Sequence, residues 1–200
     1  MKNVAILDYG LGNLRSVMRG LERAGARTLI TSRVEEIMAA DGVVLPGVGA
    51  FSEGMMKLGT LQKALLEYVE DSPVLGICLG MQMLTEWSEE HGMHRGLGLV
   101  PGTVRRFPRE PGMKVPHMGW NTLQLTQESP LFAGIPDGSY VYFVHSYYAN
   151  TGPANTLAST GYVLPFASAI GSNNAYGVQF HPEKSGPVGL KLLENFIGLL

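Results

Sequence analysis

Short apolar runs alternate with helical patterns in the first half of the chain. The runs at residues 4–7, 26–30, 43–45 and 74–77 predict strands, with Pro46 expected to end the third. Apolar residues three and four positions apart predict helices from Leu14 up to Gly25, and over residues 34–39, 52–70 and 79–84. Strands without polar alternation are buried on both faces, as in parallel sheets. This half therefore predicts βαβ units and a doubly wound sheet.

The second half is richer in strand-forming residues and turns. Residues 102–104, 139–144, 156–159, 166–170 and 176–180 predict strands, and an amphipathic pattern over residues 188–199 predicts a closing helix. We expect these strands to extend the sheet in antiparallel fashion. The predicted fold class is α/β, with an open, doubly wound mixed sheet of flavodoxin-like type. No linker or repeat divides residues 1–200, so we expect one domain.

Composition and charge narrow the class of protein. The chain is 45% hydrophobic and 16% charged, which is typical of a chain with a packed core. A formal net charge of -2 provides no basic surface for nucleic acid or an anionic membrane. The first apolar run is too short for a signal peptide and ends at Asp8. The single cysteine excludes an internal disulfide and favours a reducing, cytoplasmic setting.

That cysteine, Cys78, lies between a predicted strand and a predicted helix. Residues 76–80 read Gly-Ile-Cys-Leu-Gly, the form of a nucleophile elbow with cysteine in place of serine. Glycines two positions before and after the nucleophile relieve crowding in such a tight turn. The start of the following helix directs free amides at the sulfur and favours the thiolate. The alternative is a small apolar cysteine packed in a strand.

A base for such a nucleophile follows the predicted strand at residues 176–180. Residues 180–183 read Phe-His-Pro-Glu, so His181 lies at a strand end. Sites in doubly wound sheets form outside the carboxyl ends of strands, where Cys78 also lies. Glu183 can accept a hydrogen bond from one imidazole nitrogen while the other faces the thiol. An ordinary loop histidine is the alternative, and the cysteine elbow in the same chain argues against it.

Residues 76–82, together with His181-Pro182-Glu183 at this separation, resemble the class I, triad-type glutamine amidotransferases. The resemblance covers essentially the whole chain. It implies that Cys78 attacks the side-chain carbonyl of glutamine, giving a γ-glutamyl thioester and free ammonia. It also implies that His181 passes the thiol proton to the leaving amine and then activates water, with Glu183 orienting it. By position, Gln82 would bind glutamine rather than face solvent.

Two backbone amides are expected to bind the oxyanion of this reaction. One belongs to Leu79, next to the nucleophile. The other belongs to Val48, in the loop Pro-Gly-Val-Gly-Ala-Phe at residues 46–51. Because glycines flank Val48, its peptide can rotate, and we hypothesise that this rotation acts as an on/off control.

Five segments in order narrow the resemblance to the glutaminase subunits of imidazole glycerol phosphate synthases: residues 8–13, 46–51, 116–121, 143–147 and 181–185. This implies a heterodimer with a (β/α)₈-barrel synthase (cyclase) subunit, which receives the ammonia by a protected path. The products would be imidazole glycerol phosphate and an aminoimidazole carboxamide ribotide, in histidine biosynthesis. The resemblance assigns Asn13, Trp120 and Lys184 to the rim facing the partner, and Gly49, Ser146 and Tyr147 to the glutamine pocket.

Two weaker motifs are set aside. The turn Gly10-Leu11-Gly12 lacks the third glycine of a dinucleotide fingerprint, because Arg15 stands in its place. His91 and His94, with Glu89 and Glu90 beside them, could suggest a metal, but no third ligand is indicated and a solvated loop is favoured. We expect no metal and no cofactor, because thiol chemistry is complete without one.

Three other functions remain open. A glutaminase subunit serving pyridoxal phosphate or anthranilate synthesis would share the chemistry, but the segments at residues 8–13 and around Trp120 argue against it. A cysteine-elbow hydrolase or chaperone-like relative would need neither Gln82 nor the adjacent His-x-Glu. An inactive binding partner is disfavoured by the intact Cys78, His181 and Glu183.

Overall fold

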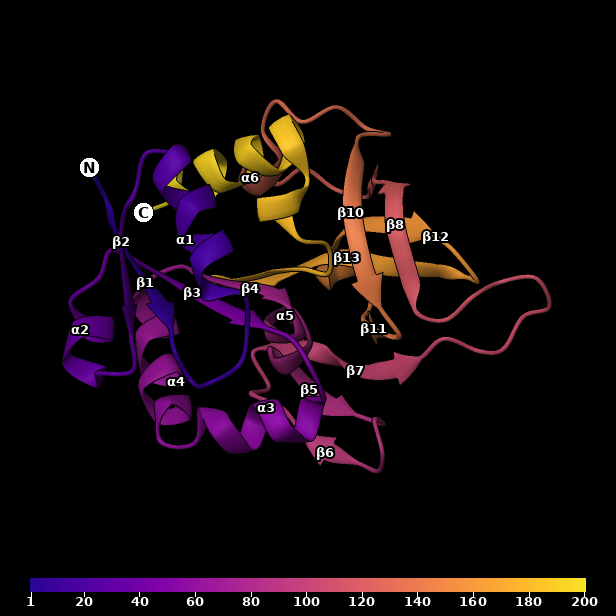
Figure 1. Ribbon diagram of the computed structural model, residues 1–200, viewed down its shortest axis with the longest axis horizontal. Coiled ribbons are helices and arrows are strands. Elements are labelled where there is room, and N and C mark those ends of the chain that lie inside the picture. Colours follow the sequence, from indigo (N-terminus) through magenta and orange to yellow (C-terminus); the bar gives the residue numbers. More distant parts are fainter.

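The computed structural model describes residues 1–200, and strands alternate with helices along the first half (Figure 1). The strands β2, β1, β3 and β4 are parallel neighbours in that order. The elements of this half are β1 (Asn3–Leu7), α1 (Leu14–Arg23), β2 (Arg27–Thr31), α2 (Val34–Met38), β3 (Gly42–Gly47), α3 (Phe51–Leu58), α4 (Leu61–Asp71), β4 (Val74–Cys78) and α5 (Leu79–Met83). The predicted βαβ pattern is confirmed.

Two predictions in this half are wrong in detail. The helix expected over residues 52–70 is two helices, because Gly59 takes a positive φ of 47° and ends α3. Pro46 does not end the third strand but lies within β3, opposite Ile77 of β4. Pro46 is tolerated there because the pairing of β3 with β1 stops at Val44, so its missing N–H breaks no hydrogen bond on that side.

The second half extends the same sheet. Its strands are β5 (Thr85–Ser88), β6 (His94–Arg95), β7 (Val100–Arg106), β8 (His117–Thr122), β9 (Gln124–Leu125), β10 (Tyr140–His145), β11 (Tyr147–Asn150), β12 (Thr156–Gly161), β13 (Pro165–Ser172) and β14 (Ala175–Val178). The helices are η1 (Pro130–Phe132), η2 (Pro153–Asn155), η3 (Pro182–Lys184) and α6 (Gly186–Gly198). Strand β14 runs parallel to β4, and the sheet then continues through β13, β11 and β7, each antiparallel to the strand before it. The mixed sheet of the predicted fold class is confirmed, with twelve strands in all.

The predicted strand at residues 139–144 does not join this sheet. It is β10, which pairs only with β8 in a separate antiparallel ribbon. Alternate residues of β10, Val141, Phe143 and His145, are buried, so the strand has one buried face. A strand of that pattern suits a ribbon lying over the core rather than the middle of a sheet. The ribbon stands beside the sheet at the end away from β2 (Figure 1).

Helices cover both faces of the parallel strands. Figure 1 shows α1 and α6 on one face and α2, α3 and α4 on the other. Alternate strand residues enter two separate cores, with Val4 and Ile6 in one and Ala5 and Leu7 in the other. The cores hold 26 and 25 buried residues, so the sheet is covered about equally on its two sides. None of the helices has the length and apolar character needed to cross a membrane.

Candidate active site

The site lies where three neighbouring strands end. Gly47 ends β3 and pairs with Cys78, the last residue of β4. Strand β14 lies on the other side of β4 and is followed by residues 179–181. Because these strands are parallel, their carboxyl ends meet at one edge of the sheet. The fold thus brings Cys78 and His181 to the same place from positions far apart in sequence.

Cys78 has the strained backbone of a nucleophile elbow. Its φ is 55° and its ψ is -110°, and α5 begins at the next residue. A Cβ on Gly76 would lie 2.7 Å from backbone atoms of Gly80 and Met81, which confirms that a small residue is needed there. At Gly80 the reason differs from the expected one: its Cβ would lie 1.8 Å from the Leu45 carbonyl oxygen of β3. The second glycine therefore lets α5 pack against the neighbouring strand.

His181 and Glu183 form a buried pair. Nδ1 of His181 lies 2.9 Å from Oε1 of Glu183, and their side chains are 4% and 1% exposed. Nε2 is buried and makes no standard hydrogen bond, so it is available to the Cys78 thiol. Burial lowers the pKa of His181, but interactions with Cys78 and Glu183 outweigh it and raise the pKa to about 9. The arrangement therefore stabilises an imidazolium next to the sulfur.

One cavity of about 330 Å³ gathers most of the predicted site residues. Its lining comprises Val48, Gly49, Cys78, Leu79, Gln82, Glu90, Val144, His145, Ser146, Tyr147 and His181. Glu183 lies behind His181 and does not line it. A wider, more open hollow of about 800 Å³ lies over residues 125–133, away from these side chains. The smaller cavity is the candidate substrate pocket, because it contains Cys78 and His181, the predicted nucleophile and base.

Gln82 is 5% exposed and its side chain points inward, not to solvent. Its Nε2 donates to the Tyr147 carbonyl at 3.0 Å and to Oε1 of Gln179 at 3.0 Å. Gln179 in turn donates from Nε2 to Cys78 Sγ at 3.6 Å. Sequence reasoning missed Gln179, which it placed inside an apolar strand. Gln82 therefore connects Cys78, through Gln179, to the backbone of the pocket wall.

Glu90 is a second residue that sequence reasoning missed. The segment around it was expected to be a solvated loop, but Glu90 is only 8% exposed and lines the cavity. Its Oε2 accepts the backbone N–H of Phe51 at 2.6 Å. An anchored carboxylate in the pocket wall suits a cationic group such as the α-ammonium of an amino acid.

The predicted oxyanion loop is packed against the elbow. A Cβ on Gly47 would lie 2.5 Å from the Tyr9 hydroxyl and 2.9 Å from Cβ of Leu79, so only glycine fits there. The Tyr9 hydroxyl donates to the Pro46 carbonyl at 2.6 Å and holds the start of the loop. Val48 is 43% exposed at the mouth of the cavity, and Gly49 takes a positive φ of 100°. The start of the loop is therefore held in place by packing and a hydrogen bond, whereas Val48 lies between two glycines.

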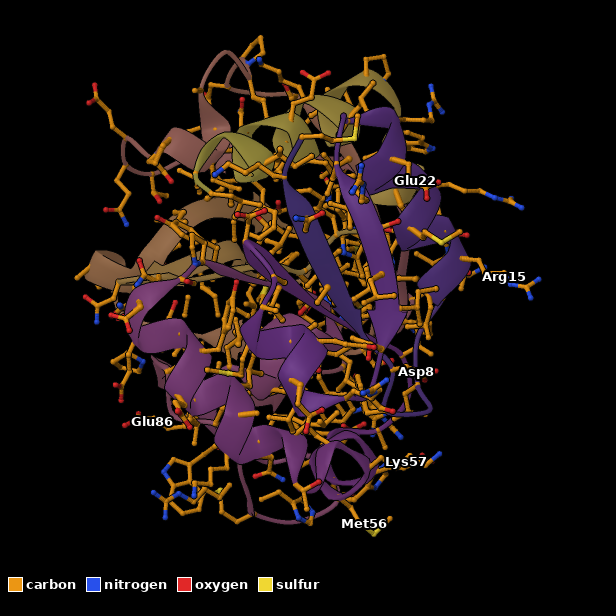
Figure 2. All side chains as sticks on the ribbon, turned by 90° about the vertical axis from the view of Figure 1, so that its left-hand side faces the viewer. Asp8, Arg15, Glu22, Met56, Lys57 and Glu86 are labelled. Carbon is orange, nitrogen blue, oxygen red and sulfur yellow. The ribbon has the colours of Figure 1, made fainter.

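The turn after β1 has no phosphate-cradle character. Asp8 accepts the N–H of Gly10 at 3.2 Å, which places a carboxylate where a dinucleotide would need free amides. Arg15 extends from α1 into solvent, away from this turn (Figure 2). Asn13, predicted for the partner-facing rim, is exposed just before α1.

The other two predicted rim residues lie close together. Trp120 is 56% exposed, and its ring centroid lies 6.1 Å from that of Tyr142 on the paired strand. Nζ of Lys184 lies 5.9 Å from the centre of the same Tyr142 ring. The alternative of Trp120 as a core residue is excluded by its exposure. Tyr142, which joins the two, carried no signal in the sequence.

Comparison with known proteins identifies the family of this chain. A model of the class I glutamine amidotransferases matches residues 5–199, and the chain belongs to that family. Among its curated relatives is the imidazole glycerol phosphate synthase subunit HisH of Methanosarcina mazei, 55% identical over 200 residues that cover 98% of each chain. The protein of the same name from Methanosarcina acetivorans is 54% identical, again over 98% of each chain.

Solved structures agree on the fold. A crystal structure of a glutamine amidotransferase superposes with a TM-score of 0.76, covering 98% of this chain and 97% of the other. The two sequences are only 18% identical, so the likeness concerns the arrangement of the chain.

Proposed function

We propose that this chain is the glutaminase subunit of an imidazole glycerol phosphate synthase, acting as one unit over residues 1–200. The observation that carries the proposal is the shared cavity of Cys78 and His181, with Glu183 hydrogen-bonded behind the imidazole. Near-full-length relatives at 54–55% identity, which are named as this subunit, support the choice among amidotransferases.

The geometry supports a thioester route. The Cys78 thiol gives its proton to Nε2 of His181, and the sulfur forms a bond to the side-chain carbonyl carbon of glutamine. The tetrahedral intermediate collapses as His181 protonates the departing nitrogen, which leaves as ammonia. His181 then takes a proton from water, whose oxygen attacks the γ-glutamyl thioester and releases glutamate and the thiol. Glu183 keeps the proton on Nδ1 and stabilises the imidazolium throughout.

Backbone amides stabilise the oxyanion in this proposal. The Leu79 amide lies at the start of α5, next to the sulfur, and Val48 contributes the second amide from the mouth of the cavity. The substrate is held by residues of the cavity lining, namely Gln82, Gly49, Ser146 and Tyr147. Glu90 lines the same cavity and binds the ammonium group of the substrate.

The acceptor of the ammonia is a (β/α)₈-barrel synthase (cyclase) subunit in a heterodimer. Exposed Trp120 and Lys184, with Asn13 at the start of α1, form part of the surface that faces it. The synthase forms imidazole glycerol phosphate and an aminoimidazole carboxamide ribotide in histidine biosynthesis. A single unpaired cysteine as nucleophile suits the reducing cytoplasm.

The test is glutamate release from glutamine, measured with this protein alone and with the barrel synthase and its nucleotide ligand. We expect low activity alone, a large rise with the liganded synthase, and none with Cys78→Ala. Activity that depends on Cys78 but ignores this synthase would point to another acceptor subunit. No release under either condition would refute the glutaminase.

A further inference from the structure

Two buried histidines outside the triad connect the ribbon to the substrate cavity. His117 of β8 and His145 of β10 are directly opposite each other in the ribbon, and they are 3% and 6% exposed. Nδ1 of His117 lies 3.0 Å from Nε2 of His145. At the inner end, Nδ1 of His145 lies 2.8 Å from the carbonyl oxygen of Tyr147. At the outer end, Nδ2 of Asn121 lies 3.3 Å from Nε2 of His117.

The direction of this chain of hydrogen bonds is fixed at both ends. A carbonyl oxygen only accepts, so Nδ1 of His145 carries a proton and its Nε2 must accept from His117. The orientation of the Asn121 amide is fixed independently, because its Nδ2 donates to the Gly161 carbonyl at 2.9 Å and its Oδ1 accepts the Thr122 N–H at 2.8 Å. The Asn121 amide therefore donates to His117, and both histidines hold their proton on Nδ1.

The surroundings keep both rings neutral and in place. The His117 ring stacks between Tyr162 and Phe143, with centroid distances of 4.0 Å and 4.8 Å. Burial lowers the pKa of His117 to about 4 and that of His145 to about 3. A proton added to either ring would make two hydrogen-bond donors face each other. The chain of hydrogen bonds therefore requires both imidazoles to be neutral.

The chain of hydrogen bonds ends at the carbonyl oxygen of Tyr147, which accepts two hydrogen bonds. The Tyr147 carbonyl accepts from His145 and also from Nε2 of Gln82 at 3.0 Å. Ser146 and Tyr147 line the cavity beside Cys78. Losing the His145 hydrogen bond would free this peptide and weaken the anchor of Gln82 together with it.

We propose that His117 and His145 are positioning residues for glutamine, holding the Ser146–Tyr147 wall and Gln82 in binding geometry through the Tyr147 carbonyl. The proposal rests on the glutaminase function proposed above. Neither histidine takes part in proton transfer to the thiol. Their role is to fix a wall of the pocket, so it acts on substrate affinity more than on the chemical step.

The first test reads the ring protons directly. ¹⁵N-edited NMR of the histidine side chains in the unmodified protein at neutral pH should find His117 and His145 neutral, each with its proton on Nδ1. This tautomer is diagnostic, since a merely buried histidine has no reason to adopt the same form as its neighbour. A proton on Nε2 of either ring, or a cationic ring, would overturn the proposed chain of hydrogen bonds, and this result does not depend on turnover.

The second test separates binding from chemistry. Glutaminase kinetics in the complex with the liganded barrel synthase should show KM for glutamine raised about three- to tenfold in His145→Phe. This variant loses the hydrogen bond to the Tyr147 carbonyl and also the acceptor for Nδ1 of His117. The kcat value should stay within about threefold of the unmodified protein. His145→Asn keeps a donor near the Nδ1 position, so its KM should lie close to that of the unmodified protein. His91→Asn, at an exposed turn, is the matched control and should change neither constant.

The outcomes distinguish the two proposals. Normal turnover with an unchanged KM in His145→Phe would overturn the positioning role and leave the glutaminase intact. A loss of kcat with an unchanged KM would also overturn it, because the histidine would then act on the chemical step. No turnover by the unmodified protein would overturn the glutaminase itself and with it any role in binding glutamine.

Discussion

Replacing Glu183 with glutamine removes one negative charge beside His181 while the size of the side chain stays the same. Burial lowers the pKa of His181, but Cys78 and Glu183 together outweigh it and raise the pKa from 6.5 to about 9. Because a tenfold change in a proton equilibrium corresponds to about 1.4 kcal/mol, a pKa of about 9 in place of 6.5 means that the two partners give the imidazolium a net stabilisation of about 3 kcal/mol. Without the carboxylate, only Cys78 opposes the effect of burial, so the pKa of His181 falls.

The consequence for turnover follows from the same magnitude. Because Cys78 remains, about half of this stabilisation is lost where the imidazolium forms, and kcat falls by about 10-fold at neutral pH. A wrong tautomer would increase the loss toward about 10⁴-fold, as in serine proteases whose triad acid is made an amide. We therefore expect Glu183→Gln to lower kcat by at least about 10-fold with little change in KM.

Two assays check this. Glutamate release at saturating glutamine, with the liganded synthase present, gives kcat. The rate of Cys78 alkylation by iodoacetamide between pH 5 and 10 reports the thiolate–imidazolium pair and should shift in the variant. Glu194→Gln, on the exposed face of α6, is the matched control and should behave as the unmodified protein. A kcat within threefold and an unchanged alkylation profile in Glu183→Gln would refute the reasoning.

Three further predictions concern other parts of the molecule. Val48→Pro deletes the proposed second oxyanion amide and should lower kcat by about 10²–10³-fold with an unchanged circular dichroism spectrum; full turnover would exclude that amide. His117 and His145 have pKa values lowered from 6.5 to about 4 and about 3. Between pH 6.5 and 4 the unfolded state binds more protons, so the free energy of unfolding, measured in urea, should fall as pH falls through that window, and a flat profile would contradict this. Gly80→Ala would bring its Cβ to 1.8 Å from a carbonyl oxygen of β3 and should prevent cooperative thermal unfolding. Gly198→Ala, where a Cβ would meet nothing within 4 Å, is the control and should unfold cooperatively. A normal melting temperature for Gly80→Ala would contradict this prediction and show that α5 can move aside.

The parallel half of the fold could be predicted because burial on both faces leaves a local signal in each strand. Features that depend on distant partners could not. Apolar spacing continues through Gly59, so the break between α3 and α4 is invisible to periodicity. The β8–β10 ribbon depends on a pairing between strands about 20 residues apart, and the strand-forming composition of β10 does not say which strand it will meet.

The site shows the same division. Cys78 and His181 could be predicted because each follows a strand-like run, and strand ends meet in this class of fold. Gln179 and Glu90 belong to no local motif, and only the folded chain brings them to the cavity. The reason for Gly80 was also out of reach, since the atom that forbids a side chain there belongs to β3.

The central claim is that Cys78 forms a covalent bond with the γ-carbonyl of glutamine. The most direct test is acid quenching of the complex with the liganded synthase during turnover, followed by peptide mass spectrometry. We predict a mass increase of one γ-glutamyl group on the peptide containing Cys78, which disappears when the quenched sample is treated with hydroxylamine. Glutamate release at the normal rate in Cys78→Ala, or a γ-glutamyl group on any other residue, would contradict the account.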